Sequence, residues 1–288
     1  MKRFLKRRLN RFLPNAVRAS FKRRLGAKFA EPVSTKFVVE EISAALKCRI
    51  DSPEASWSFL APVGCKNDLA NLTDTPEGRA EFQSLARAAK TGGVLFDIGA
   101  HSGLISAMFC AAQSQNKAFA FEPSPVLAER LIAIRELNQF GDHMRIEQIG
   151  IGEETKAIEM ILDPAGGFIQ SQHFEHTMWA APQSVQVQME TIHSAASRLN
   201  AIPQFVKIDI EGYEFEAIKG SIEFLAHHKP AIFLELHLNY FEQRNLSPKL
   251  LIDMLLECGY GFHTSTGTRL KPAEVYDSPL PIVHVVAQ

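Results

Sequence analysis

From Val94 onward, short apolar segments alternate with longer amphipathic ones, and this alternation constrains the fold more than any other feature. Continuous apolar strands separated by helices are typical of a parallel α/β sheet that helices cover on both faces. The predicted strands are 94–98, 117–121, 144–149, 156–161, 184–189, 205–210, 231–237, 260–264 and 282–287. The predicted helices are 103–114, 124–138, 191–199, 213–226 and 247–257. In such sheets ligands bind beyond the carboxyl ends of the strands, where we therefore expect the functional residues.

The first 30 residues form a basic arm. Residues 1–28 hold eleven Lys or Arg and no acid, so the formal net charge of −1 for the whole chain hides an acidic body. Hydrophobic residues at helical spacing predict that the arm docks on an anionic membrane surface. A solvated basic tail explains the composition equally well, and we do not expect nucleic acid as a partner.

Residues 31–79 are predicted to be an N-terminal β/helical appendage and linker, and residues 80–288 the main domain. The segments "KFVVEE" and "SWSFLAP" are strand-like, whereas the polar, Pro- and Gly-bearing "CKNDLANLTDTPEG" indicates a connection. The main domain begins with the helical segment "GRAEFQSLARAAK". The four cysteines are scattered without a C-x-x-C pair, and no apolar run reaches about 20 residues. We therefore expect reduced thiols and a cytoplasmic protein, peripheral to a membrane if the arm docks there.

The segment "LFDIGAHSG" carries the first predicted strand into a glycine turn and a helix. Asp97 ends the strand, and the turn runs through Gly99, Ala100 and His101 to Gly103. Glycines allow a tight turn, and a helix N-terminus offers free N–H groups. The turn lacks the G-x-G-x-x-G spacing of a dinucleotide site, and an ordinary strand-to-helix turn is the alternative interpretation.

The second predicted strand ends in "FAFEPSP". Glu122 lies nineteen residues after Gly103, an offset at which an acid accepts hydrogen bonds from ribose hydroxyls. Pro123 stops the strand, Ser124 is suited to cap the next helix, and Pro125 suits its first position. The two segments together indicate a ligand with a ribose and no pyrophosphate.

Two later strands end in charged residues. In "FVKIDIEGYE", Lys207, Asp209 and Glu211 share one side, and a buried strand tolerates such charges only with partners or a function. We interpret Lys207 as a structural ion-pair residue and Asp209 as functional. In "AIFLELHLNY", Glu235 is more enclosed than His237, which stands at the strand end. His237 is either a general base or a histidine bonded to a neighbouring loop.

The segments "FDIGAHSG", "AFEPSP", "VKIDIEGYEFEAIKG" and "FLELH" resemble, in order and spacing, the FkbM family of class I S-adenosylmethionine-dependent methyltransferases. The resemblance implies a Rossmann-like sheet of seven strands, six parallel and one antiparallel. It places Glu122 at the cofactor ribose and Asp209 at the reactive methyl end. It places Asp97, Gly99, Ala100 and Gly103 around the methionine part of the cofactor. We also expect His101 and Pro123 to contact the cofactor.

The resemblance implies O-methylation of a hydroxyl on a sugar, glycolipid or natural product. Asp209 is the first candidate for the general base and His237 the second. We expect Glu211, Glu235, His173 and Trp179 to contact the acceptor. Asp209, Glu211 or Glu235 could hold a divalent ion, but nothing in the spacing demands one and we predict no metal site. Two alternatives are a nicotinamide-dependent oxidoreductase, which the glycine turn disfavours, and a cofactor-binding module that has lost catalysis. His101 stands where the family often has Asn.

Overall fold

The computed structural model describes residues 35–52, 55–162, 168–169 and 183–288 of the chain. The predictions for the basic arm, for His173 and for Trp179 lie outside the described residues. Within the described ranges, no helix combines the length and the apolar character that crossing a bilayer requires.

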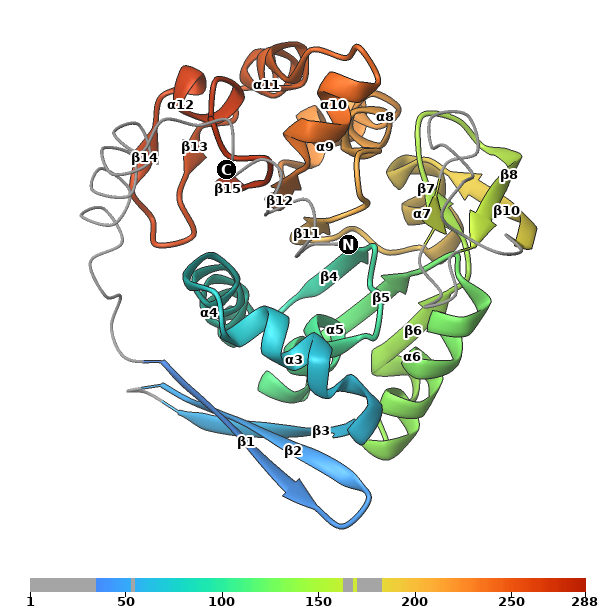
Figure 1. Ribbon diagram of the computed structural model, residues 1–288, viewed down its shortest axis with the longest axis vertical. Coiled ribbons are helices and arrows are strands. Elements are labelled where there is room, and N and C mark those ends of the chain that lie inside the picture. Colours follow the sequence, from blue (N-terminus) through green and yellow to red (C-terminus); the bar gives the residue numbers. More distant parts are fainter. Residues whose placement is uncertain (1–34, 53–54, 163–167, 170–182) are drawn as a thin grey trace.

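The described part is built around an eight-stranded sheet in the order β14-β13-β15-β12-β11-β4-β5-β6 (Figure 1). Six strands run parallel, whereas β15 and β14 run in the opposite direction. The strands are β4 (Val94–Ile98), β5 (Lys117–Phe121), β6 (Met144–Glu147), β11 (Phe205–Ile208), β12 (Ala231–Leu236), β13 (Phe262–His263), β14 (Arg269–Leu270) and β15 (Val283–Ala287). The predicted mostly parallel sheet is confirmed. It gains an eighth strand because the two-residue β14 pairs with β13 at the edge.

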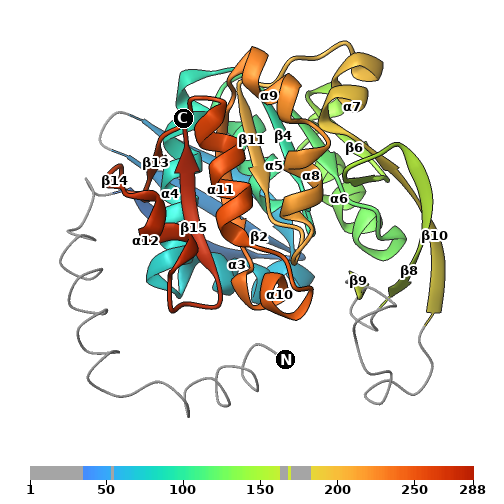
Figure 2. The same cartoon turned by 90° about the horizontal axis from the view of Figure 1, so that it is seen from above.

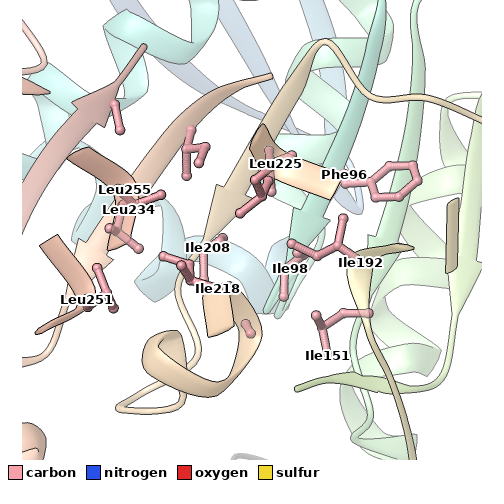
Figure 3. Packing of buried hydrophobic residues seen from close by; sticks show 14 of the residues in the cluster. Phe96, Ile98, Ile151, Ile192, Ile208, Ile218, Leu225, Leu234, Leu251 and Leu255 are labelled. Carbon is pink, nitrogen blue, oxygen red and sulfur yellow. The ribbon is translucent and has the colours of Figure 1, made fainter. Parts of the chain in front are cut away.

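Helices cover both faces of this sheet, and successive strand residues feed two separate cores (Figure 2). Phe96 and Ile98 point into one core, seen in Figure 3, whereas Leu95 points into the other. The first core is covered by α7 (Ile192–Leu199), α8 (Glu214–Lys219), α9 (Ile222–His228), α10 (Leu238–Gln243), α11 (Pro248–Glu257) and α12 (Pro272–Tyr276). The second is covered by α4 (Pro76–Thr91), α5 (Leu104–Ala112) and α6 (Pro125–Leu137). Burial on both faces explains why these strands are mostly apolar.

The appendage is a three-stranded antiparallel sheet of β1 (Lys36–Ile42), β2 (Ala45–Asp51) and β3 (Ser56–Pro62). It packs on the second core, where Trp57 Nε1 donates a hydrogen bond to the Met108 carbonyl of α5 at 3.3 Å. The turn η1 (Val63–Cys65) and the helix α3 (Lys66–Thr73) follow. The prediction of a connection over 65–78 is wrong. Residues 66–73 form a helix whose Leu69 is buried in the core and whose Leu72 packs against that core.

A second small sheet stands beside the main one in the order β7-β10-β8-β9, clearly separate in Figure 2. Its strands are β7 (Gly150–Ile151), β8 (Lys156–Leu162), β9 (Phe168–Ile169) and β10 (Gln183–Glu190). The predicted strands 156–161 and 184–189 exist, but they leave the main sheet. Their alternating polar and apolar residues suit an antiparallel pair with one exposed face, and Met160, Val187 and Met189 form its own core.

The helix predicted over 213–226 is broken into α8 and α9. Gly220 ends α8 where its backbone contacts that of Glu153, since a Cβ there would lie 2.4 Å from the Glu153 carbonyl oxygen. The Ser221 hydroxyl accepts a hydrogen bond from the Ile192 N–H at 2.9 Å. The helix thus breaks where Gly220 and Ser221 pack against the segments that carry Glu153 and Ile192. A last turn, η2 (Gly141–His143), precedes β6.

Candidate functional site

The glycine turn after β4 is shaped by three residues in the left-handed region, Gly99 (φ 79°), His101 (φ 53°) and Gly103 (φ 81°). Histidine is among the side chains that tolerate this conformation. A Cβ on Gly99 would lie 1.9 Å from the Asp209 carbonyl oxygen, and one on Gly103 would lie 2.5 Å from Leu131 Cδ2. Neighbouring protein segments therefore leave no room for a side chain at Gly99 or Gly103. At Gly99, the turn packs directly against the backbone of Asp209.

Glu122 follows β5 and holds the glycine turn from the side. Its Oε2 accepts a hydrogen bond from the His101 N–H at 2.9 Å, and its Oε1 accepts one from the Ser124 N–H at 3.0 Å. Burial raises the pKa of Glu122 to about 7, although these two hydrogen bonds act in the opposite direction. A carboxylate has about four acceptor positions, so two remain for a ligand. The predicted capping of α6 by Ser124 is confirmed, with Pro125 at the first helical position.

Asp97, the fourth residue of β4, is fully buried. Its Oδ2 accepts a hydrogen bond from the Ser106 hydroxyl at 2.7 Å, whereas its Oδ1 has no hydrogen-bond partner. Burial raises the pKa of this carboxyl group, and the charge of Lys207 opposes the shift. A buried acceptor without a donor is costly. Asp97 Oδ1 thus fits a ligand that brings a donor to the glycine turn.

Lys207 lies at the centre of a buried charge network on the face of the sheet that α4 covers. Its ammonium donates a hydrogen bond to Asp209 Oδ2 at 3.1 Å. Burial alone would lower its pKa, but four surrounding carboxylates raise it well above the usual range. These carboxylates belong to Asp209, Glu81, Asp97 and Glu235. The structural ion-pair role predicted for Lys207 agrees with this arrangement.

His237, the residue after β12, meets the acids that follow β11. Its ring is 1% exposed. Nδ1 lies 2.9 Å from Glu214 Oε1, and Nε2 lies 3.3 Å from Glu211 Oε2 and 3.8 Å from Asp209 Oδ1. Burial alone would lower the pKa of His237, but the hydrogen bond and charge of Glu214, with Asp209 and Glu211, raise it to about 10. The ring therefore carries a proton at neutral pH in this arrangement.

Glu235 joins this cluster to a second, part-buried histidine. Its Oε1 lies 3.5 Å from His237 Nε2, and its Oε2 lies 3.6 Å from His284 Nδ1 on the paired strand β15. Burial, together with Asp209, raises the pKa of Glu235 to about 7. His284 Nδ1 also lies 3.0 Å from Glu81 Oε2 of α4. The network thus runs continuously from α4 to the ends of β11 and β12.

The structure brings together most of the residues that the sequence singled out. Asp209, Glu211, Glu235 and His237 form one cluster, and the glycine turn contacts it through the backbone of Asp209. Asp97, Glu122 and Pro123 lie at the ends of the two adjacent strands. His101 points toward α3, where its Nδ1 lies 3.8 Å from Asp68 Oδ2.

Three residues of the network were missed from the sequence: Glu81, Glu214 and His284. Glu214 begins α8, a position where acids are common, yet it is fully buried and bonded to His237. Glu81 sits on the apolar face of α4, and an acid on that face is a usable signal. His284 stands on the same face of β15 as the buried Val286, so it shows a weaker signal of the same kind.

Comparison with known proteins gives one match by sequence. The family model described as "Methyltransferase FkbM domain" matches residues 97–262, more than half of the chain. No curated protein matches the chain.

The solved structures that this chain matches include methyltransferases. A methyltransferase FkbM from Methylobacillus flagellatus is 18% identical with a TM-score of 0.42, and the match covers 68% of this chain and 43% of that one. The chain thus spans less than half the length of that protein. A precorrin-6y C5,15-methyltransferase from Geobacter metallireducens is 14% identical with a TM-score of 0.40, covering 75% and 89% of the two chains.

Proposed function

This chain belongs to the FkbM methyltransferase family, and we propose that it transfers a methyl group from S-adenosylmethionine to a hydroxyl of an acceptor. One observation carries the proposal. The ribose-type acid Glu122 and the cluster of Asp209 and His237 meet at the same glycine turn, through the His101 N–H and the Asp209 carbonyl. A cofactor held by Glu122 across this turn would present its other end to the cluster.

The residues at the ends of β4 and β5 suit the parts of this cofactor. Glu122 has two acceptor positions left for the ribose hydroxyls. Asp97 Oδ1 lacks a donor, which the ammonium group of the methionine part would supply. Ala100, His101 and Pro123 flank these two acids. When bound, S-adenosylmethionine supplies an electrophilic methyl group on a sulfonium, and nearby carboxylates favour this positive charge.

The protein's part in the reaction is to position the acceptor oxygen and to take its proton. As the oxygen gains a methyl group it becomes positively charged, so its proton becomes strongly acidic and a carboxylate suffices as the base. We assign this role to Asp209, which is part-exposed and which Lys207 holds in place through Oδ2. Glu211 and Glu235 are placed to contact the acceptor, and we extend that role to His173 and Trp179.

The acceptor class follows from the family resemblance. We propose a hydroxyl of a sugar, glycolipid or natural product. Because the match is to methyltransferases, a nicotinamide-dependent oxidoreductase is not retained as an alternative. A module that binds the cofactor without catalysis would bind S-adenosylhomocysteine equally well. Only a measurement of methyl transfer distinguishes it from an enzyme.

The test has a binding arm and a turnover arm. S-Adenosylhomocysteine at 100 times its dissociation constant should stabilise the protein by about 2.7 kcal/mol and raise its melting temperature by several degrees, whereas NAD should have no effect. A radiolabelled methyl donor should then label at least one acceptor in a screen of glycans, glycolipids and small alcohols. Stabilisation by NAD alone would refute the proposal, and binding without any labelled acceptor would favour the non-catalytic module.

Cofactor affinity should depend on pH through Glu122. Ribose hydroxyls donate to the ionised carboxylate, whose pKa of about 7 leaves it mostly protonated at pH 6. We expect the dissociation constant of S-adenosylhomocysteine to rise by about tenfold between pH 8 and pH 6. Titration calorimetry of the wild type and of Glu122→Gln measures this, and the variant should bind weakly with a flat profile. A variant with the same pH dependence as the wild type would assign the titration to another group.

A further inference from the structure

The cluster at the ends of β11 and β12 has the composition of a metal site. A carboxylate oxygen of Asp209, one of Glu211 and a ring nitrogen of His237 all lie within 4.8 Å of one another. This spacing is compatible with ligands around a single ion, since neighbouring ligands at 2.0–2.2 Å from a metal lie roughly 3 Å apart. The three residues come from two adjacent strand ends, so the sheet fixes their relative positions.

The ring nitrogen of His237 gives an independent reason to expect a ligand there. His237 is 1% exposed, and its Nε2 makes no hydrogen bond although it points between Glu211, Asp209 and Glu235. Its other nitrogen, Nδ1, is hydrogen-bonded to the fully buried Glu214. A cation that displaces the Nε2 proton would find the Nδ1 proton still directed to Glu214, and the ring would then present its Nε2 lone pair to the cluster. Histidines that bind metals are oriented by a carboxylate in this way.

We infer that Asp209, Glu211 and His237 bind a divalent cation, with Glu214 orienting the histidine. Two carboxylates and one imidazole suit a first-row ion such as Mn²⁺, which accepts both oxygen and nitrogen ligands. Three protein ligands leave coordination positions open for an acceptor. The neighbouring group of Glu81, Glu235 and His284 is different, because its inward nitrogen, His284 Nδ1, is already hydrogen-bonded to Glu81.

This inference rests on the proposed function and refines its chemistry. An acceptor hydroxyl bound to the cation would lose its proton more readily, because the ion stabilises the developing alkoxide. The oxygen of Asp209 that holds the ion cannot also take the proton, so Asp209 becomes a ligand and the proton passes to Glu235. The O–H bond and the donor S–CH₃ bond break, and the O–CH₃ bond forms.

Manganese binding by the full-length protein tests the site directly. The protein is stripped with EDTA, dialysed and titrated with MnCl₂, and free Mn²⁺ is followed by electron paramagnetic resonance. We expect one bound ion per chain. Glu211→Gln should weaken binding by at least about tenfold, and Glu214→Gln by about 10–100-fold. Glu242→Gln, an exposed position on the adjacent helix α10, is the matched control and should bind as the wild type does.

Glu211 is exposed, so Glu211→Gln should fold and still test the site if the buried Glu214→Gln variant fails to fold. Wild-type protein that leaves the free Mn²⁺ signal unchanged would overturn the inference, and so would Glu211→Gln binding Mn²⁺ as tightly as the wild type. S-Adenosylhomocysteine binding in the presence of EDTA separates this result from the proposed function. If the nucleoside binds and Mn²⁺ does not, only the cation site fails; if the nucleoside does not bind, the proposed function fails.

Discussion

Replacing Asp209 by Asn should lower methyl transfer by about 10²–10⁴-fold, the range typical of a lost proton acceptor, without preventing cofactor binding. The substitution keeps the shape of the side chain and an oxygen that accepts the hydrogen bond from Lys207. It removes the negative charge that takes the proton or, with a cation bound, holds the ion. Initial rates with a labelled methyl donor and a positive acceptor measure the effect.

Asp253→Asn is the matched control for this substitution, because Asp253 lies on α11 in a surface ion pair with Lys249. It should leave the rate unchanged, and both variants should still be stabilised by S-adenosylhomocysteine. Methyl transfer at the wild-type rate in Asp209→Asn would exclude Asp209 from both roles. A loss of rate alone does not separate a base from a metal ligand, and the Mn²⁺ titration makes that distinction.

Replacing Lys207 by Met should lower the free energy of unfolding by about 3–5 kcal/mol at pH 8, the cost typical of removing one partner from a buried charge group. Lys207 is 4% exposed, its ammonium lies among four carboxylates, and no other buried cation adjoins Asp97 in the described residues. Methionine keeps the length of the apolar stem and removes the charge. Urea unfolding of both proteins measures the difference.

The loss should shrink as the pH falls below 7. Burial raises the pKa of Glu235 to about 7 and also raises that of Asp97. As the pH falls, these carboxyl groups take up protons and become neutral in the folded protein, so they depend less on the charge of Lys207. Lys219→Met, at an exposed lysine paired with Glu153, is the matched control and should unfold like the wild type. A Lys207→Met protein as stable as the wild type at pH 8 would show that the carboxylates are not charged together.

Much of the site was predictable because strand ends can be recognised along the chain. Apolar runs that stop at Asp97, Glu122, Asp209 and His237 mark the carboxyl edge of a parallel sheet. A parallel sheet then brings these ends to one edge, whatever the segments between them contain. The helices on both faces follow from the same pattern.

Other features depend on contacts between segments that lie far apart in the sequence. Glu81 and His284 are 203 residues apart and meet only because α4 covers β15 and β12. The helix α3 escaped prediction because only Leu69 and Leu72 reach the core from a short segment that is otherwise mostly polar. The strands β8 and β10 read like members of the main sheet, because a local pattern does not say which partner a strand will pair with.

The sequence by itself determined the fold class, the glycine turn and the acids at the strand ends, Glu122 among them, because each is encoded by a few neighbouring residues. Only the tertiary structure decided what those residues do to one another. It showed that Gly99 makes room for the Asp209 backbone, and that Glu214 turns the His237 ring toward the cluster. The physical reason is that hydrogen bonds and buried charges act over a few ångströms, and only the folded chain sets those distances.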